Sequence, residues 1–121
     1  MTNHNIHIVD IPTLVDARKL IQKIGSDPQS IDIMAPKAVF KAVRVHNIIL
    51  QDAIIIKQDM LSIGGEVAIP QWSFEHHQKS ADILIMGTLK QLKELIEKLK
   101  RHYPRIKMFS HQLSLIVDEI L

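Results

Sequence analysis

Apolar residues recur along this chain with two different periods, and each period predicts one kind of element. Spacings of three and four residues predict helices over 14–24, 53–63 and 89–103, and a last helix from residue 113 onward. Alternation or short apolar runs predict strands over 6–11, 31–35, 39–45, 67–69 and 83–86. Residues 106–109 fit either a short edge strand or a turn.

Strands and helices therefore alternate along the chain, which is typical of an α/β fold. We expect helices packed on a mixed sheet of about five strands, with a ferredoxin-like arrangement for the first six elements. The two strands that flank the helix over 53–63 should run parallel to each other. We expect residues 1–121 to form a single domain, because we find no internal repeat and no linker-like segment.

Local signals mark where these helices begin and end. Thr13 and Thr88 are suited to cap helix starts, with Asp16 and Gln91 three residues further on. Gly25 and Gly64 follow apolar helical stripes, so each is predicted to adopt the left-handed conformation that closes a helix.

Composition limits the functional classes. The chain has no cysteine, which excludes disulfides and thiolate metal sites. Its net charge of +2 and its aromatic content of 4% argue against a nucleic-acid partner, and the small charge also argues against a membrane surface. The sequence shows no transmembrane run and no leader, so we expect a cytoplasmic protein.

Two features have the residue types needed for chemistry. Lys57 points into the apolar arc of its predicted helix, where a lysine of lowered pKa acts as a nucleophile or base. The favoured alternative is a stem that lies along the core edge, with the ammonium in water near Asp52 or Asp59. Gly87 and Thr88 turn a strand directly into a helix, where backbone N–H groups can bind an anion; the favoured alternative is an ordinary capped turn.

Other polar groups are weaker candidates. Residues 75–77 are Glu-His-His and have metal-ligand chemistry, but adjacent loop residues rarely bind one ion together, so we favour solvated side chains. A basic cluster between residues 98 and 107 favours a solvated face over a nucleic-acid patch. No nucleophile elbow, P-loop, dinucleotide fingerprint or HExxH motif is present. We therefore expect no catalytic residue, no metal and no cofactor.

Three segments, taken together, resemble a known family. They are IGSDPQSIDIMAPKAVFKAVRV, IIIKQDMLSIGGEVAIP and ADILIMGTLKQLKELIEKLK, which span residues 24–45, 54–70 and 81–100. They resemble the region that precedes the catalytic barrel in long-form dihydropteroate synthases, which join a pterin to p-aminobenzoate in folate biosynthesis. The resemblance covers most of the chain from Ile24 onward and weakens after Tyr103.

The barrel itself is not part of this chain, because a (β/α)₈ barrel typically needs about 250 residues. Gly64-Gly65-Glu66 is similar to a motif of the barrel, but Val67-Ala68-Ile69 follows where Ser-Thr-Arg is required. The resemblance therefore implies a stand-alone, non-catalytic accessory or regulatory domain related to dihydropteroate synthase. It implies a barrel-type synthase or another pterin enzyme as a partner.

The alternative function is a small ligand-binding protein or enzyme that uses Lys57, Gln58, Gly87 and Thr88. A third possibility is an RNA-binding domain that uses the basic cluster near Arg101. The apolar stripe of the last helix also predicts a homodimer, with Ile116, Ile120 and Leu121 at the contact.

Overall fold

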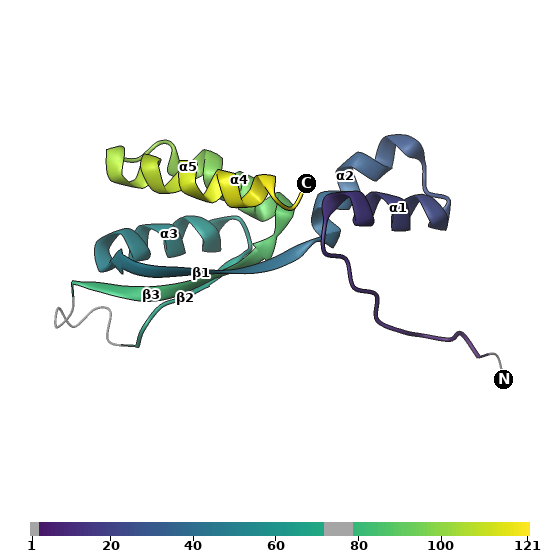
Figure 1. The fold of residues 1–121 in the computed structure, drawn as a ribbon, viewed down its shortest axis with the longest axis horizontal. Helices are drawn as coiled ribbons and strands as arrows, with labels where there is room; N and C mark the ends of the chain where they lie inside the picture. Colours follow the sequence, from purple (N-terminus) through teal and green to yellow (C-terminus); the bar gives the residue numbers. More distant parts are fainter. Residues whose placement is uncertain (1–2, 72–78) are drawn as a thin grey trace.

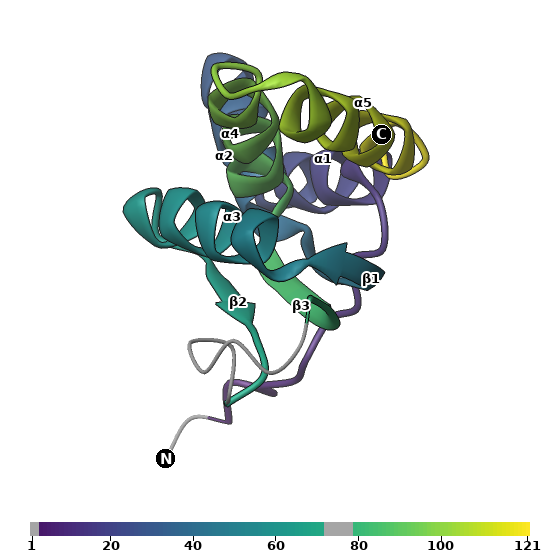
Figure 2. The same cartoon turned by 90° about the vertical axis from the view of Figure 1, so that its left-hand side faces the viewer.

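The computed structural model describes residues 3–71 and 79–121. Within these residues, the elements in chain order are α1 (Leu14–Ile24), α2 (Pro28–Ala38), β1 (Phe40–Ile49), α3 (Leu50–Ser62), β2 (Glu66–Ala68), β3 (Ser80–Thr88), α4 (Leu89–Leu99) and α5 (Pro104–Asp118). Helices α3, α4 and α5 lie on one side of the sheet, and α1 and α2 pack together beyond one end of it (Figures 1 and 2). The predicted α/β class is confirmed.

The prediction of about five mixed strands is wrong. The described residues form a three-stranded sheet in the order β1-β3-β2, and both neighbouring pairs are antiparallel. Because β1 and β2 both run opposite to β3, they run parallel to each other, as predicted for the strands that flank α3. The ferredoxin-like arrangement proposed for the first six elements is also wrong, because its first and second strands, at 6–11 and 31–35, do not form.

Residues 31–35 are helical, because the preceding Asp-Pro pair starts a helix. The side chain of Asp27 accepts a hydrogen bond from the backbone N–H of Gln29, and Pro28 occupies the first helical position, where its missing N–H costs nothing. Helix α2 continues through Pro36 and buries Ala35 completely. The alternation of Ile31, Ile33 and Ala35 therefore does not reflect a strand.

Proline also determines where the last helix begins. Helix α4 ends at Leu99, short of the predicted bound of 103, and Pro104 is the first residue of α5. Residues 106–109, expected to be a strand or a turn, belong to this helix, which therefore begins nine residues before Leu113. Ile106, Leu113, Val117 and Ile120 are buried on α5 and at its C-terminal end.

The predicted helix boundaries at the other sites are confirmed. Thr13 and Thr88 accept hydrogen bonds from the backbone N–H groups of Asp16 and Gln91, and the side chain of Gln91 completes a reciprocal capping box. Gly25 and Gly64 have φ values of 87° and 93°, the left-handed conformation that glycine adopts at little cost.

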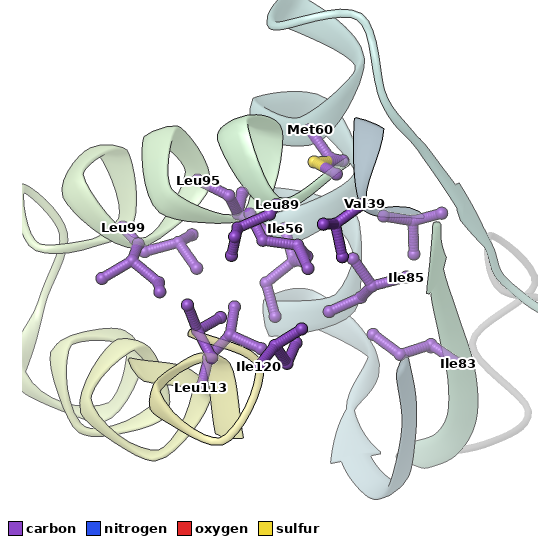
Figure 3. Close-up of a cluster of buried hydrophobic side chains, with 14 of the residues drawn as sticks. Val39, Ile56, Met60, Ile83, Ile85, Leu89, Leu95, Leu99, Leu113 and Ile120 are labelled. Carbon is purple, nitrogen blue, oxygen red and sulfur yellow. The ribbon is translucent and has the colours of Figure 1, made fainter. Parts of the chain in front are cut away.

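The core lies between the sheet and the helices (Figure 3). From β3, Ile83 and Ile85 point into this layer, and Val39 lies just before β1. Ile56 and Met60 of α3 and Leu95 and Leu99 of α4 pack on the helix side of this layer. Burying side chains of this size contributes roughly 1.5–3 kcal/mol each, so the helices depend on the sheet for their stability.

Candidate functional site

Lys57 lies on α3 where the helix faces the outer edge of β2. Its Nζ donates to the backbone carbonyl of Val67 at 2.6 Å and forms an ion pair with Oε1 of Glu66 at 3.0 Å. The Lys57 side chain is 29% exposed, so its stem lies along the core edge as expected, although its partners are not Asp52 or Asp59. The pKa of Glu66 is lowered, mainly by the hydrogen bond from Lys57 and next by the hydrogen bond from the backbone N–H of Val67.

These contacts close the free edge of β2. The same carboxylate oxygen of Glu66 accepts from the backbone N–H of Val67 at 2.8 Å. Both backbone polar groups of Val67 are therefore bonded to side chains, on the edge that β3 does not cover. Covered edges protect a sheet from unwanted pairing with other strands.

Gly87 and Thr88 form the turn from β3 into α4, as predicted. The backbone N–H of Thr88 donates to Oε1 of Gln91 at 2.9 Å, and that of Leu89 donates to the carbonyl of Val39 at 2.8 Å. The N–H of Gln91 donates to Oγ1 of Thr88 at 3.1 Å. Three of the backbone donors at this helix start thus have intramolecular partners, which favours the capped turn over an anion site.

The fold brings two glycines from distant segments against one methionine. A Cβ at Gly65 would lie within 3.0 Å of Cε, Sδ and Cγ of Met60, and a Cβ at Gly87 would lie equally close to Cε of Met60 and 3.0 Å from Oε1 of Gln91. Met60 is fully buried between them. Lys57 precedes Met60 by one helical turn, and Gln58 is exposed beside it. Ligand binding by Lys57, Gln58, Gly87 and Thr88 stays a prediction.

The sheet face opposite the helices is uncovered in the described part of the chain. It carries Phe40 and Ala42 of β1, Leu84 and Met86 of β3, and Ala68 of β2, of which Leu84 and Met86 are half-buried and the others exposed. A hollow of about 320 Å³ lies beside this patch, and Ala68, Leu84, Arg44 and Asp82 are among the residues that line it. We call these five apolar residues the open face.

A polar cluster flanks the open face at a bulge in β1. The register between β1 and β3 shifts between Val45 and Ile48, and Asn47 has a φ of 54°. Asp82 of β3 accepts from the backbone N–H of Asn47 at 3.0 Å, from Arg44 at 3.1 Å and from His46 at 3.2 Å. The pKa of Asp82 is lowered, mainly by the hydrogen bond from the backbone N–H of Asn47 and next by the hydrogen bond from Arg44.

A second cluster, which the sequence analysis missed, fixes α5 to α3. Asp52 is only 4% exposed and accepts two hydrogen bonds from Arg105, at 2.6 and 2.8 Å, and one from the hydroxyl of Tyr103. Burial raises the pKa of Asp52, but the bonds from Arg105 and Tyr103 and the charge of Arg105 outweigh it, and the pKa is lowered. The signal was present: Asp52 precedes Ile56 and Met60 at steps of four, so it lies on the buried face of α3.

The remaining candidates have structural partners or lie outside the described residues. Lys98 contacts Ser62, Lys100 pairs with Glu97, and Arg105 pairs with Asp52, so much of the basic cluster is engaged within the chain. Residues 75–77 lie in the segment that the structure does not describe. Among the residues it does describe, no group of three His, Asp or Glu side chains is placed to hold a metal ion. No helix in the same part of the chain combines the length and apolar character needed to cross a membrane.

Comparison with known proteins gives one informative similarity. Over 97 residues, the chain is 30% identical to the bifunctional dihydropteroate synthase/dihydropteroate reductase of Helicobacter pylori. The match covers 80% of this chain but 26% of the relative, so the chain spans about a quarter of the length of that protein. No family model and no solved structure matches the chain. The chain is thus related to one region of a dihydropteroate synthase protein.

Proposed function

We propose that this chain is a non-catalytic accessory domain of the dihydropteroate synthase system, and that it binds a barrel-type synthase through the open face. The similarity to about a quarter of the Helicobacter pylori protein is the observation that carries the proposal. The part of that relative outside the match is nearly three times as long as the matched region, which leaves room for a barrel of about 250 residues. The matched region would then be the part outside the barrel.

The contacts of the candidate residues support a binding role over a catalytic one. Lys57 is bonded to Glu66 and Val67, and three backbone donors at the turn after Gly87 are occupied within the chain. A catalytic base or an anion site needs such groups to be available to a substrate. The open face, by contrast, leaves apolar side chains in solvent beside a hollow, which is typical of a surface that another protein covers.

The direct test is a binding titration between the purified chain and a barrel-type dihydropteroate synthase from the same cell. We expect a complex that Ala68→Glu weakens about tenfold or more, because the substitution places a charge within an apolar contact. Gln51→Glu adds the same charge to exposed α3, on the other side of the sheet, and should leave binding unchanged. Absence of a complex, or equal weakening by both variants, would refute the proposal.

The name of the relative also includes a dihydropteroate reductase activity, and a part in that reaction is the second candidate. Hydride transfer of this kind relies on a carrier cofactor, and the chain has no dinucleotide fingerprint. We expect the pure chain neither to join a pterin pyrophosphate to p-aminobenzoate nor to oxidise NADPH in the presence of dihydropteroate. Turnover in the second assay would favour the reductase role over the accessory one.

A further inference from the structure

The segment before α1 is an arm that contacts little of its own chain, and within it Asn5 has a left-handed φ of 49°. We define the arm as residues 3–12, which form neither a helix nor a paired strand. Ile6 and Ile8 are 93% and 98% exposed, and the side-chain hydrogen bonds of Asn3 and His7 stay within the arm. The arm runs away from the body of the molecule, beyond the end of the sheet at which β1 begins (Figure 1).

The sequence of the arm is that of a strand without a partner. Ile6 and Ile8 alternate with polar Asn5 and His7, the period that places two isoleucines on one face. Pro12 and Thr13 end this pattern, and Thr13 starts α1. Exposed isoleucines in an extended segment favour pairing with a sheet edge, which would satisfy the backbone and cover the side chains together.

The outer edge of β1 is a free edge of suitable length. The N–H of Leu89 donates to the carbonyl of Val39, so these two opposed residues form a hydrogen-bonded pair. Hydrogen-bonded and non-hydrogen-bonded pairs then alternate along the antiparallel ladder between β1 and β3. By this alternation, Phe40, Ala42 and Arg44 direct their N–H and C=O groups away from β3. Within the described residues, no strand covers this edge, whereas Lys57 and Glu66 close the corresponding edge of β2.

A hollow of about 250 Å³ lies between the C-terminal half of this edge and α5. Residues 45–49 form one wall, Met108, Phe109 and Gln112 are on the other, and the paired Asp52 and Arg105 also line the hollow. Met108 is 66% exposed, so an apolar side chain entering from an added strand would find an apolar contact. The edge and the hollow together fit a strand that carries large aliphatic side chains on one face.

We propose that the arm of one molecule pairs with the outer edge of β1 in a second copy, so that two copies exchange arms around a two-fold axis. The base of the arm is fixed, because the N–H of Leu14 donates to the carbonyl of Ile120. From there the arm points away from its own sheet, and an extended segment of its length spans roughly 30 Å, enough to reach a neighbouring molecule. Ile6 and Ile8 then lie on the helix side of the partner's sheet, toward Met108.

This dimer differs from the one expected from the last helix. Ile120 is 8% exposed and packs within its own chain, so the predicted contact of Ile116, Ile120 and Leu121 loses its central residue. The exchange and the accessory function can be told apart at Ala68, which lies on β2, whereas the exchange uses the edge of β1, where Phe40 and Ala42 also belong to the open face. Ala68→Glu should therefore leave the dimer intact even where it weakens synthase binding.

The test is the native mass of the full chain across a micromolar dilution series, with hydrogen exchange on the dimeric sample. We expect a dimer in which the amides of Ile6, Ile8 and Ala42 are protected. The double variant Ile6→Lys/Ile8→Lys should raise the dissociation constant about tenfold or more. Ile24→Lys is the matched control, because Ile24 is 82% exposed at the far end of α1, and it should have no effect.

Ala42→Pro provides a second, independent disruption. Its N–H points outward, so proline removes a donor needed by the added strand without breaking the ladder to β3. A monomer at high micromolar concentration would overturn the proposal, as would a dimer that survives the double lysine variant. A monomer with a protected arm would place the arm on its own sheet and would overturn it equally.

Discussion

The packing of Met60 between Gly65 and Gly87 makes a sharp prediction about stability. In Gly87→Ala, the new Cβ would lie within 3.0 Å of Cε of Met60, so that methyl group must move away. Met60 is fully buried and has Gly65 on its other side, which leaves it little room. Overpacking of this kind typically costs about 1–3 kcal/mol, and the lower unfolded-state entropy of alanine recovers up to about 1 kcal/mol. We therefore expect a net loss of about 1–2 kcal/mol.

The second half of the prediction uses Met60→Leu, a swap that usually costs less than about 1.5 kcal/mol. Leucine ends one atom earlier than methionine and has no atom at the Cε position. It should therefore relieve most of the cost of Gly87→Ala. It should relieve little of the cost of Gly65→Ala, because a Cβ at Gly65 also meets Sδ and Cγ, at 2.8 and 2.9 Å.

Urea unfolding of the four proteins in each cycle gives the two coupling energies directly. We expect a coupling of about 1 kcal/mol for Gly87 with Met60→Leu and a smaller one for Gly65. Unchanged m values would show that the comparison concerns the native state. If Gly87→Ala costs the same in both backgrounds, the methionine does not fill the space that the glycine leaves.

Three further predictions concern single contacts. Gly64→Val should lower the unfolding free energy by more than about 1 kcal/mol, since a β-branched residue is strained at positive φ; an unchanged urea midpoint would contradict this. Arg105→Gln should lower the thermal midpoint most near pH 7. The pKa of Asp52 is lowered in the folded protein, so ionised Asp52 stabilises the fold above about pH 4, and this contribution is lost as the pH falls through the folded pKa. The difference in thermal midpoint between the variant and the wild type should thus narrow toward pH 3, and a difference that does not change with pH would argue against a role for the charge of Asp52. Lys57→Met should cost about 1 kcal/mol in urea unfolding through the lost bond to Val67 while leaving synthase binding unchanged, and weakened binding would restore Lys57 as a site residue.

Sequence patterns predicted the helices best where a cap and a periodic stripe agree. The starts at Thr13 and Thr88 and the glycine stops after α1 and α3 are local chemistry, so they could be predicted without knowing the fold. The prediction of a strand at 31–35 was wrong because an alternation over five residues does not distinguish a strand from a helix of mixed polarity. There, the decisive signal was the capping aspartate followed by Pro28.

The arm shows a different limit of sequence reasoning. Residues 6–11 have a strand pattern, but a strand exists only when a neighbour supplies hydrogen bonds, and periodicity cannot identify that neighbour. The contacts of Lys57 were missed for a similar reason. Its direction into the apolar arc was evident, but its bond to Val67 depends on where β2 pairs with β3.

The residues behind the family resemblance are mostly those that hold this fold together. Asp27 starts α2, Gly64 ends α3, Thr88 starts α4, and Gly65 and Gly87 make room for Met60. A similarity built on such residues predicts a shared backbone, and it transfers chemistry only if the chemical groups are also available. Here the groups that are available lie elsewhere, on the open face and along the edge of β1. Tests of function should therefore begin with binding at these surfaces.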